Sequence, residues 1–265
     1  MNDEVAGHVR YEREGRIAHI VLDRPNKLNA FNDAQAIGLR NALDEFDGDE
    51  EADVAIVSGM GRAFSSGADV AERHMRSQEE LRRLGSPEGR GASGHGLLYK
   101  QVSWKPIVGA VHGYALGLGL ALALECDLTV VARDAKLQVT EIPRGLWGTR
   151  FVALMHQRGA GVFADEVILT GRIFSGEEAV DRGIFARLAD PGEHLTEAVR
   201  LAEEIAANPP LAVRAAVRAR RWYMQKYEQD DPLIRAAFPL HLTKEFQQRA
   251  EAFIDRKNRP SATEA

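Results

Sequence analysis

The segment from residue 107 to residue 127 constrains the fold more than any other part of this sequence. An apolar run, Ile107–Val111, is typical of a buried strand, and His112–Asp127 follows it with the sequence H-G-Y-A-L-G-L-G-L-A-L-A-L-E-C-D. The glycine-rich start of this segment predicts a turn, and its unbroken apolar remainder predicts a buried helix. A strand, a turn and a helix in this order point the free backbone N–H groups of the helix N-terminus toward whatever lies over the turn. The segment therefore predicts a site for an anion or a developing oxyanion.

A second glycine-containing loop has the same organisation. Gly61–Val70, with the sequence G-R-A-F-S-S-G-A-D-V, follows the strand-like run Val54–Ser58 and opens what the sequence predicts to be another helix. Two turns that each present backbone amides suit a reaction in which negative charge develops on a carbonyl oxygen. The segment Gly117–Gly119 is not a dinucleotide-binding fingerprint, because Leu122 replaces the third glycine and no βαβ unit with a ribose-binding acid follows.

Composition narrows the class of protein. With 265 residues and 45% hydrophobic content, the chain is long enough for one large domain or for a domain with a helical appendage. The net charge of −5 gives no reason to expect nucleic acid as a partner. Its single cysteine, Cys126, lies in the apolar stretch, and the sequence has no disulfide framework and no Cys/His metal spacing. It also has no apolar run that would span a bilayer, and its N-terminus is acidic where a signal peptide is basic. We therefore expect a cytoplasmic, metal-free protein with no membrane partner.

Hydrophobic periodicity predicts several further elements. Two strands flank Glu14-Gly15 as a hairpin, and helical spacing recurs further along the chain. The predicted strands are Val9–Arg13 and Arg16–Leu22; the predicted helices are Ala34–Phe46, Leu195–Ala207, Leu211–Gln229 and Thr243–Lys257, with a break at Asn208-Pro209-Pro210. Residues 73–95 are rich in Arg, Glu, Ser and Gly, which predicts a mobile or loop-rich insert.

Five segments, taken in order, resemble those of the crotonase, or enoyl-CoA hydratase/isomerase, superfamily. They are Leu22–Ala30 (L-D-R-P-N-K-L-N-A), Ala63–Asp69 (A-F-S-S-G-A-D), His112–Asp127, Glu141–Gly145 and Leu169–Ala179. The resemblance implies an α/β fold, with a crotonase-like spiral of ββα repeats that carries the active site in residues 1–195 and a C-terminal helical trimerisation region in residues 196–265. It also implies an acyl-CoA thioester as the partner, and a homotrimer or a hexamer formed as a dimer of trimers. Coenzyme A enters as part of the substrate, and no tightly bound cofactor is expected.

The resemblance also assigns roles to individual residues. It implies that the backbone N–H groups of Ala68 and Leu118 form the oxyanion hole for the thioester carbonyl, and that Asp69 orients the loop that carries Ala68. It implies that contacts with the substrate and its coenzyme A come from Lys27, Leu28, Ala30, Ser66, Asp69, Val70 and Trp147. Lys27 supplies a charge suited to a phosphate group.

The carboxylates decide which reaction is expected. By the resemblance, hydratases place one glutamate four residues after the first glycine of the helix turn and a second glutamate twenty residues later; here these positions hold Ala121 and Glu141. A pair of carboxylates can hold and deprotonate a water, whereas a single one can move a proton between two carbons. The sequence therefore predicts double-bond isomerisation of an enoyl-CoA, with Glu141 as the proton shuttle. Enoyl-CoA hydration, hydration with carbon–carbon cleavage by a hydratase/lyase, and a non-catalytic acyl-CoA carrier remain alternatives.

The surroundings of Glu141 leave two interpretations open. Trp147 and Phe151 either form a dry pocket, which would raise the pKa of this carboxyl, or belong to the core. Arg144 and Arg150 would act in the opposite direction, because pairing with a guanidinium lowers the pKa of a carboxyl. The sequence does not decide between these environments.

Other residues receive structural roles. We expect His112 to be hydrogen-bonded at the end of a strand, His156 to lie on a helix surface and Asp127 to begin the next strand. The helices after Leu211 carry more apolar residues than an appended tail would bury alone, which predicts subunit contacts. These residues are Trp222, Tyr223, Leu233, Ile234, Phe238, Leu240, Phe246 and Phe253.

Overall fold

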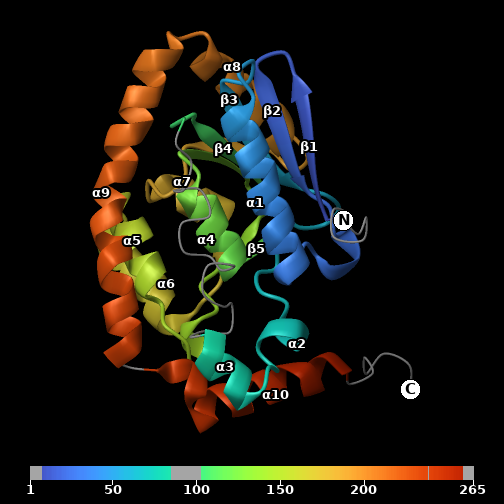
Figure 1. Ribbon diagram of the computed structural model, residues 1–265, viewed down its shortest axis with the longest axis vertical. Coiled ribbons are helices and arrows are strands. Elements are labelled where there is room, and N and C mark those ends of the chain that lie inside the picture. Colours follow the sequence, from blue (N-terminus) through green and yellow to red (C-terminus); the bar gives the residue numbers. More distant parts are fainter. Residues whose placement is uncertain (1–7, 85–102, 238, 259–265) are drawn as a thin grey trace.

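A computed structural model of the chain describes residues 8–84, 103–237 and 239–258, and it has a mixed α/β architecture (Figure 1). The main sheet has six strands in the order β1-β2-β3-β4-β6-β9. These strands are β1 (Val9–Glu14), β2 (Ile17–Leu22), β3 (Val54–Gly59), β4 (Ile107–Val111), β6 (Leu128–Ala132) and β9 (Arg187–Ala189). The predicted hairpin is confirmed, because β1 pairs antiparallel with β2; the other neighbouring strands in this sheet are parallel.

A second, three-stranded sheet positions the turn before the apolar helix. Its order is β5-β7-β8, with β5 at Tyr114–Leu116, β7 at Lys136–Gln138 and β8 at Phe174–Ser175. A parallel bridge between Ser65 and Ala115 attaches the Gly61–Val70 loop to β5. The two glycine-containing segments that the sequence singles out are therefore held against each other by backbone pairing.

Side chains of the central strands alternate between two cores, as the two-residue period of a strand requires. On β3, Ala55 and Val57 belong to the larger core, while Val54 and Ile56 belong to the smaller one. Both faces of the sheet are buried, which explains why these strands read as continuous apolar runs in the sequence.

Helices cover the two faces unequally. The larger core is built with α1 (Asp33–Gly48), α4 (Leu118–Glu125), α5 (Thr149–Gln157), α6 (Gly161–Thr170) and α7 (Gly176–Asp181). The smaller core is covered by α8 (His194–Ala206). The predicted helices at 34–46 and 195–207 are therefore confirmed, and α8 packs on the sheet through Ala198, Leu201 and Ala202. The division of the chain at residue 195 stays a prediction.

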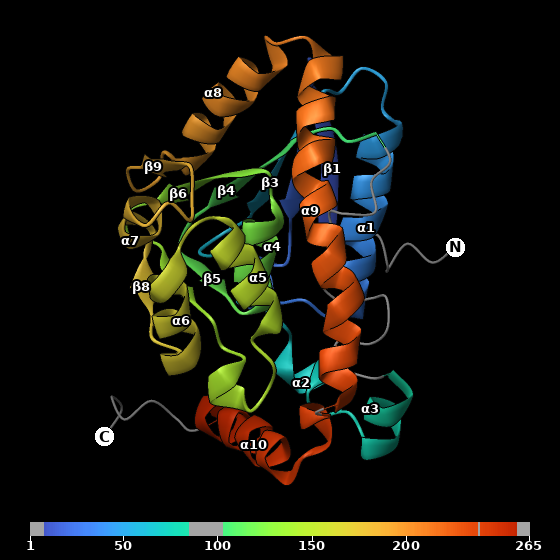
Figure 2. The ribbon, with the colours of Figure 1, turned by 90° about the vertical axis from the view of Figure 1, so that its left-hand side faces the viewer.

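Two long helices complete the described chain. The helix α9 (Pro210–Ala237) runs along one side of the molecule, and α10 (Lys244–Asn258) crosses one end of it near α2 (Val70–Arg73) and α3 (Gln78–Leu84) (Figures 1 and 2). Proline is favourable in the first helical position, where its missing N–H leaves no hydrogen bond unmade, so α9 starts at Pro210, the last residue of the predicted break. Both helices confirm the prediction, although α9 extends beyond residue 229.

A buried ion-pair cluster attaches α9 to the sheet. Arg221 is 1% exposed and donates to the carboxylate of Asp127, which Arg220 also contacts. Asp127 Oδ2 accepts a further hydrogen bond from the backbone N–H of Ile107 at 2.8 Å. Burial alone would raise the pKa of this carboxyl, but the two arginines outweigh it and hold the pKa below its ordinary value. Asp127 is thus structural, as expected.

The prediction of a mobile or loop-rich insert at residues 73–95 is wrong for residues 78–84. Residues 78–84 form α3, because Ser77 caps the helix: its hydroxyl accepts from the Glu80 N–H at 3.2 Å, and Glu80 accepts from the Ser77 N–H at 3.2 Å. Leu81, at 1% exposed, anchors the helix in a small apolar cluster. The capping pair signals a helix that composition alone obscures. Residues 85–95 lie outside the described part of the chain.

Within the described ranges, no helix is both long enough and apolar enough to cross a membrane. The same ranges contain no cluster of three or more His, Cys, Asp and Glu side chains that would hold a metal ion.

Candidate active site

The first element of the candidate site is the N-terminus of α4. All eight residues of this helix are buried, as its uniformly apolar sequence predicts. The turn before it is fixed, because the Gly117 N–H donates to Gln138 O at 2.9 Å. Leu118 is the first residue of the helix, so its N–H has no carbonyl within the helix. This amide is directed out of the start of α4.

The second element is the loop that carries Ala68. Phe31 forms a parallel bridge with Ala68: the Phe31 N–H donates to Gly67 O at 2.7 Å, and the Asp69 N–H donates to Phe31 O at 2.9 Å. In such a bridge the N–H of Ala68, which lies between Gly67 and Asp69, points away from the segment that carries Phe31. Within the part of the chain that the structure describes, neither the Ala68 N–H nor the Leu118 N–H has a hydrogen-bond acceptor.

Two glycines let the backbones of these elements approach closely. A Cβ at Gly67, where φ is 91°, would lie 2.5 Å from Leu116 O and 3.4 Å from the nitrogen of Leu118. A Cβ at Gly117, where φ is 50°, would overlap with the side chain of Thr140 and would lie 3.1 Å from Glu141 Oε1. Glycine is required at both positions by its left-handed φ and by the lack of space for a side chain.

Glu141 faces the start of α4 from a tight turn. Its carbonyl accepts from the N–H groups of Arg144 at 3.0 Å and Leu146 at 2.9 Å, around the short 3₁₀ helix Ile142–Arg144. Its side chain is half-buried, and one carboxylate oxygen lies beside Gly117. The structure therefore brings together the three residues that the resemblance places in catalysis: Glu141, Ala68 and Leu118.

These three residues share one small cavity. It has a volume of about 10 Å³, and its lining consists of Ala68, His74, Leu118, Thr140, Glu141, Arg144 and Leu146. That volume is close to the room that one water molecule needs. The cavity thus joins two free amides, one carboxylate and three further polar side chains.

Arg144 and Arg150, the two arginines close to Glu141 in the sequence, have different partners in the structure. Arg144 lines the same cavity and stacks over the Phe253 ring of α10, with 4.6 Å between the guanidinium carbon and the ring centroid. Burial lowers the pKa of Arg144, and the negative charge of Glu141 opposes that shift. Arg150 instead forms an ion pair with Glu125, the last residue of α4.

The two aromatic residues after Glu141 pack in apolar clusters. Phe151 is 2% exposed in the larger core, which supports the core interpretation for this ring. Trp147 packs with Leu81 and Phe246 in a separate cluster, and Leu146 rather than Trp147 contributes to the cavity lining. A contact of Trp147 with substrate stays a prediction.

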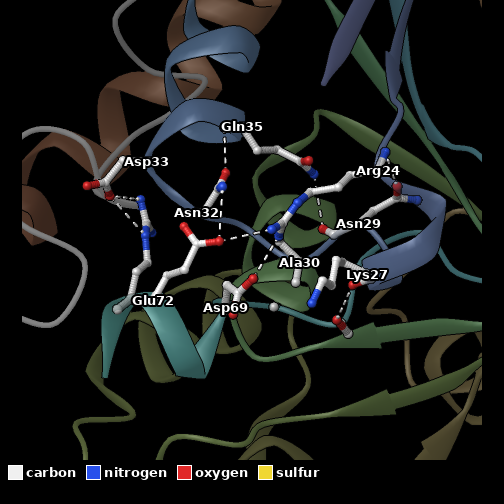
Figure 3. Close-up of polar contacts among 12 residues, drawn as sticks. Arg24, Lys27, Asn29, Ala30, Asn32, Asp33, Gln35, Asp69 and Glu72 are labelled. Carbon is white, nitrogen blue, oxygen red and sulfur yellow. Dashed lines mark hydrogen bonds and ion pairs between the residues drawn. The ribbon is translucent and has the colours of Figure 1, made fainter. Parts of the chain in front are cut away.

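The loop that carries Ala68 is held by Arg24 (Figure 3). The Arg24 guanidinium donates to Ala30 O at 3.0 Å, to Asp69 Oδ2 at 2.8 Å and to Glu72 Oε1 at 3.0 Å. Burial by itself would raise the pKa of the Asp69 carboxyl, but hydrogen bonding to Arg24 and its charge lower it below the ordinary value. This geometry suits the expected role of Asp69 as a residue that orients the loop.

The residues expected to contact coenzyme A lie on two neighbouring segments. Lys27 is exposed, at the end of the 3₁₀ helix Pro25–Lys27, and Leu28 follows it with φ of 51°. Ser66 joins the segments, because its N–H donates to Leu28 O at 2.9 Å. Ala30 and Val70 are buried at 7% and 5% exposure. The segments are adjacent, and the roles of these residues stay predictions.

His112 and His156 have the structural environments that the sequence predicts. His112 Nε2 is 2.9 Å from Gly61 O, and its ring stacks on His194 with 4.2 Å between centroids. His156 pairs with Asp165 at 2.8 Å on an exposed helix surface.

Sequence reasoning missed three residues of the cavity lining. Leu146 and Thr140 flank the Glu141 turn, and His74 ends the short helix α2, one helical turn after the Ala68 loop. The position of His74 carries a usable signal, because a titratable side chain one turn beyond an amide-bearing loop remains close to that loop. Thr140 and Leu146 carry no comparable signal.

The fold and this site define an α/β enzyme of the crotonase class, in which paired backbone amides face a carboxylate. The family profile described as enoyl-CoA hydratase/isomerase matches residues 12–257. The chain therefore belongs to the enoyl-CoA hydratase/isomerase family, a family of enzymes that act on acyl-CoA thioesters.

The chain is also similar to individual members of this family in sequence and in structure. The chain is 30% identical to the 2,3-dehydroadipyl-CoA hydratase of Escherichia coli, over 79% of this chain and 80% of that protein. A solved enoyl-CoA hydratase from Mycobacterium tuberculosis is 34% identical, with a TM-score of 0.69 over 94% of this chain and 96% of that one. An enoyl-CoA hydratase/isomerase structure from Mycobacterium paratuberculosis, at 24% identity, supports the fold with a TM-score of 0.79 over 93% of this chain and 98% of that one.

Proposed function

We propose that this protein isomerises a 3-enoyl-CoA to a 2-enoyl-CoA. One observation carries the proposal: among the described residues that line the cavity with Ala68 and Leu118, Glu141 is the single carboxylate. The position on α4 where the resemblance expects a second acid holds Ala121, which is 2% exposed. A single carboxylate suits the movement of one proton between two carbons.

The proposed reaction uses the two free amides and Glu141. The Glu141 carboxylate removes a proton from C2, and the C2–H electron pair is delocalised into the thioester carbonyl, which becomes a dienolate oxyanion. The N–H groups of Ala68 and Leu118 donate to this oxygen at the moment when its charge is largest. Glu141 then returns the same proton to C4, and the double bond moves from C3–C4 to C2–C3. The reaction needs no second acid.

Substitution of Glu141 by glutamine tests this assignment, because the amide keeps the shape of the side chain and cannot carry the proton. We expect the rate constant kcat to fall ~100-fold or more, with little change in the affinity for a CoA thioester. A matched control is Glu177→Gln on α7, an exposed carboxylate that pairs with Arg133. Near-wild-type turnover by the Glu141 variant would reject the proposal, and tight thioester binding without turnover in the wild type would favour a carrier.

Hydration of a 2-enoyl-CoA is the second candidate. Two of the relatives described above are named hydratases. The cavity itself has room for about one water molecule, and polar side chains surround that room. A water held beside the amides is what addition across the double bond requires. Hydration followed by carbon–carbon cleavage would begin with the same step.

Coenzyme A recognition is part of the proposal. Lys27, exposed beside the Ala68 loop, would contact a phosphate, while Ser66, Val70 and Ala30 would border the pantetheine chain. Lys27→Ala should raise the KM for the thioester and leave kcat nearly unchanged, because a contact made equally in the ground state and in the transition state affects binding alone.

Assembly into a trimer or a dimer of trimers is proposed as well. The C-terminal helices expose Leu211, Trp222 and Phe253 at 78%, 65% and 38%. Exposed apolar side chains of this size commonly mark subunit contacts. Sedimentation equilibrium measures the assembly directly, and a monomer that binds CoA thioesters would reject it.

A further inference from the structure

We propose that His74 is a second proton-transfer residue at this site, and that His74 and Glu141 together allow the protein to hydrate 2-enoyl-CoA thioesters. The proposal rests on the proposed function, because it uses the same amides and the same glutamate. The observation behind it is that the imidazole and the carboxylate border one cavity, which has a volume of about 10 Å³.

The backbone fixes where His74 lies. It caps the C-terminus of α2, where its N–H donates to Val70 O at 3.0 Å, and α2 starts immediately after Asp69. The imidazole is therefore one helical turn from the loop whose Ala68 amide faces the cavity. Because Arg24 holds Asp69 in place, the start of α2 is held together with the loop.

Packing fixes the ring. His74 is 5% exposed, and its ring lies against Phe246 of α10 with 5.4 Å between centroids and 51° between planes. Phe246 is fully buried, and its ring carries no charge. The imidazole is thus held by an apolar neighbour on one side and borders the cavity as well.

The chemistry of the other polar groups singles out His74. Thr140 supplies a hydroxyl that can only hydrogen-bond a water at neutral pH, and Arg144 supplies a cation. The charged groups that face the cavity are Glu141 and Arg144; Arg73, next to His74, forms its ion pair with Asp33 instead. Among the described lining residues, His74 and Glu141 are therefore the two whose side chains ordinarily exchange protons in catalysis.

A second proton-transfer group is what hydration needs and what α4 does not provide. The Ala121 side chain has no polar atom, and the carboxylate of Glu125 is committed to Arg150 at the other end of the helix. His74 supplies the missing function from the C-terminal end of α2 instead of from α4. The cavity between them has room for about one water molecule.

Neutral His74 takes a proton from the water while the water oxygen bonds to C3, and the C2–C3 π electrons move into the thioester carbonyl. The resulting enolate oxygen is held by the Ala68 and Leu118 N–H groups, and protonated Glu141 gives its proton to C2. The product is a 3-hydroxyacyl-CoA. The imidazolium then loses its proton to solvent, and Glu141 regains one from solvent, so both groups return to their starting states.

The test compares two reactions in two histidine variants. Purified full-length protein is assayed for hydration of crotonyl-CoA, by loss of the conjugated thioester absorbance, and for isomerisation of 3-hexenoyl-CoA. His74→Gln should lower hydration by ~100-fold or more, the usual scale of general acid–base catalysis, and change isomerisation by less than about threefold. The matched control is His241→Gln, because His241 is also 5% exposed and lies against an aromatic ring, that of Trp147, outside the cavity lining.

Unchanged hydration in His74→Gln, or an equal loss of both reactions, would overturn the role of His74. A wild type that isomerises without hydrating would overturn this inference and leave the proposed function intact. Full activity of Glu141→Gln in both assays would overturn the proposed function itself.

Discussion

The two ends of α4 each have a glutamate close by, and the two glutamates lie in opposite environments. At the start of the helix, Glu141 is half-buried beside Gly117 and borders the cavity. At the end, Glu125 is fully buried and ion-paired with Arg150. A rise of about 1.5 Å per residue places Leu118 and Glu125 roughly 10 Å apart along the axis. The comparison shows that location and burial, rather than residue type, decide which carboxylate borders the cavity.

The helix dipole explains why the two ends suit different tasks. The N-terminus of α4 carries a partial positive charge and an amide without an acceptor in the helix, so it suits the negative charge that would develop on the thioester oxygen in the proposed reaction. The C-terminus carries a partial negative charge, which disfavours a carboxylate there. Arg150 compensates for this at Glu125, and the pair serves the packing of α5 on α4.

The largest effect is expected from breaking the pair at the end of α4. Glu125→Gln leaves the Arg150 guanidinium, which is 12% exposed, without its counter-charge, and should lower the free energy of unfolding by about 3–5 kcal/mol. Urea unfolding followed by circular dichroism measures this loss. The double variant Glu125→Leu/Arg150→Met removes both charges and should recover most of the stability. Equal stability of the single variant and the wild type would contradict the comparison.

The next effect is expected from a methyl group at the start of the helix. Gly117→Ala would press on Thr140 and the Glu141 carboxylate, and misplacing a catalytic group by about 1 Å costs on the order of 100-fold in rate. The ratio kcat/KM should fall by roughly 10- to 100-fold. Gly192→Ala is the matched control: its φ is 90° and nothing lies within 4 Å of the added Cβ, so it has the backbone strain without the contact. Equal activity of the two variants would show that Gly117 serves the backbone alone.

The smallest effect concerns the ion pair between Arg24 and Asp69, which holds the Ala68 loop. Asp69→Asn weakens the hold of Arg24 on the Ala68 loop and should cost about 1–2 kcal/mol of stability at pH 7. The pKa of Asp69 is lower in the folded state than its ordinary value of 3.8, so the stabilisation is complete above that value and disappears as the pH falls through the folded-state pKa. Urea unfolding at pH 7 and below pH 3.8 should therefore show the difference between variant and wild type shrinking in acid. A difference that persists at low pH would mean that shape, not charge, stabilises the loop.

Periodicity predicted several elements, because their buried side chains recur at a regular spacing along the sequence. The hairpin, α1, α8, α9 and α10 appear where the pattern places them, and α4 is buried on every side as an apolar helix must be. The helix at residues 78–84 was not predicted, because Gly and Ser residues dominate the composition of residues 73–95. The pair Ser77 and Glu80, which caps α3, was the local signal that composition concealed.

The candidate site also contains residues that the sequence predicted and residues that it did not. Ala68, Leu118 and Glu141 were identified by resemblance, since two amide-bearing turns and a glutamate keep a recognisable spacing along the chain. His74 was not assigned to the site, because its place on the cavity depends on how α2 and the Glu141 turn meet α4. Contacts between segments far apart in the sequence have no periodic signature.

By itself, the sequence determined several of the local elements, the two glycine-containing turns and the family of enzymes. These follow from hydrophobic periods, from turn chemistry and from short motifs, all of which are properties of neighbouring residues. Only the tertiary structure decided which charges meet: Arg150 pairs with Glu125, Arg24 holds Asp69, and His74 borders the cavity beside Glu141. Electrostatic and proton-transfer roles depend on distance and burial in space, and both are set when the segments pack together.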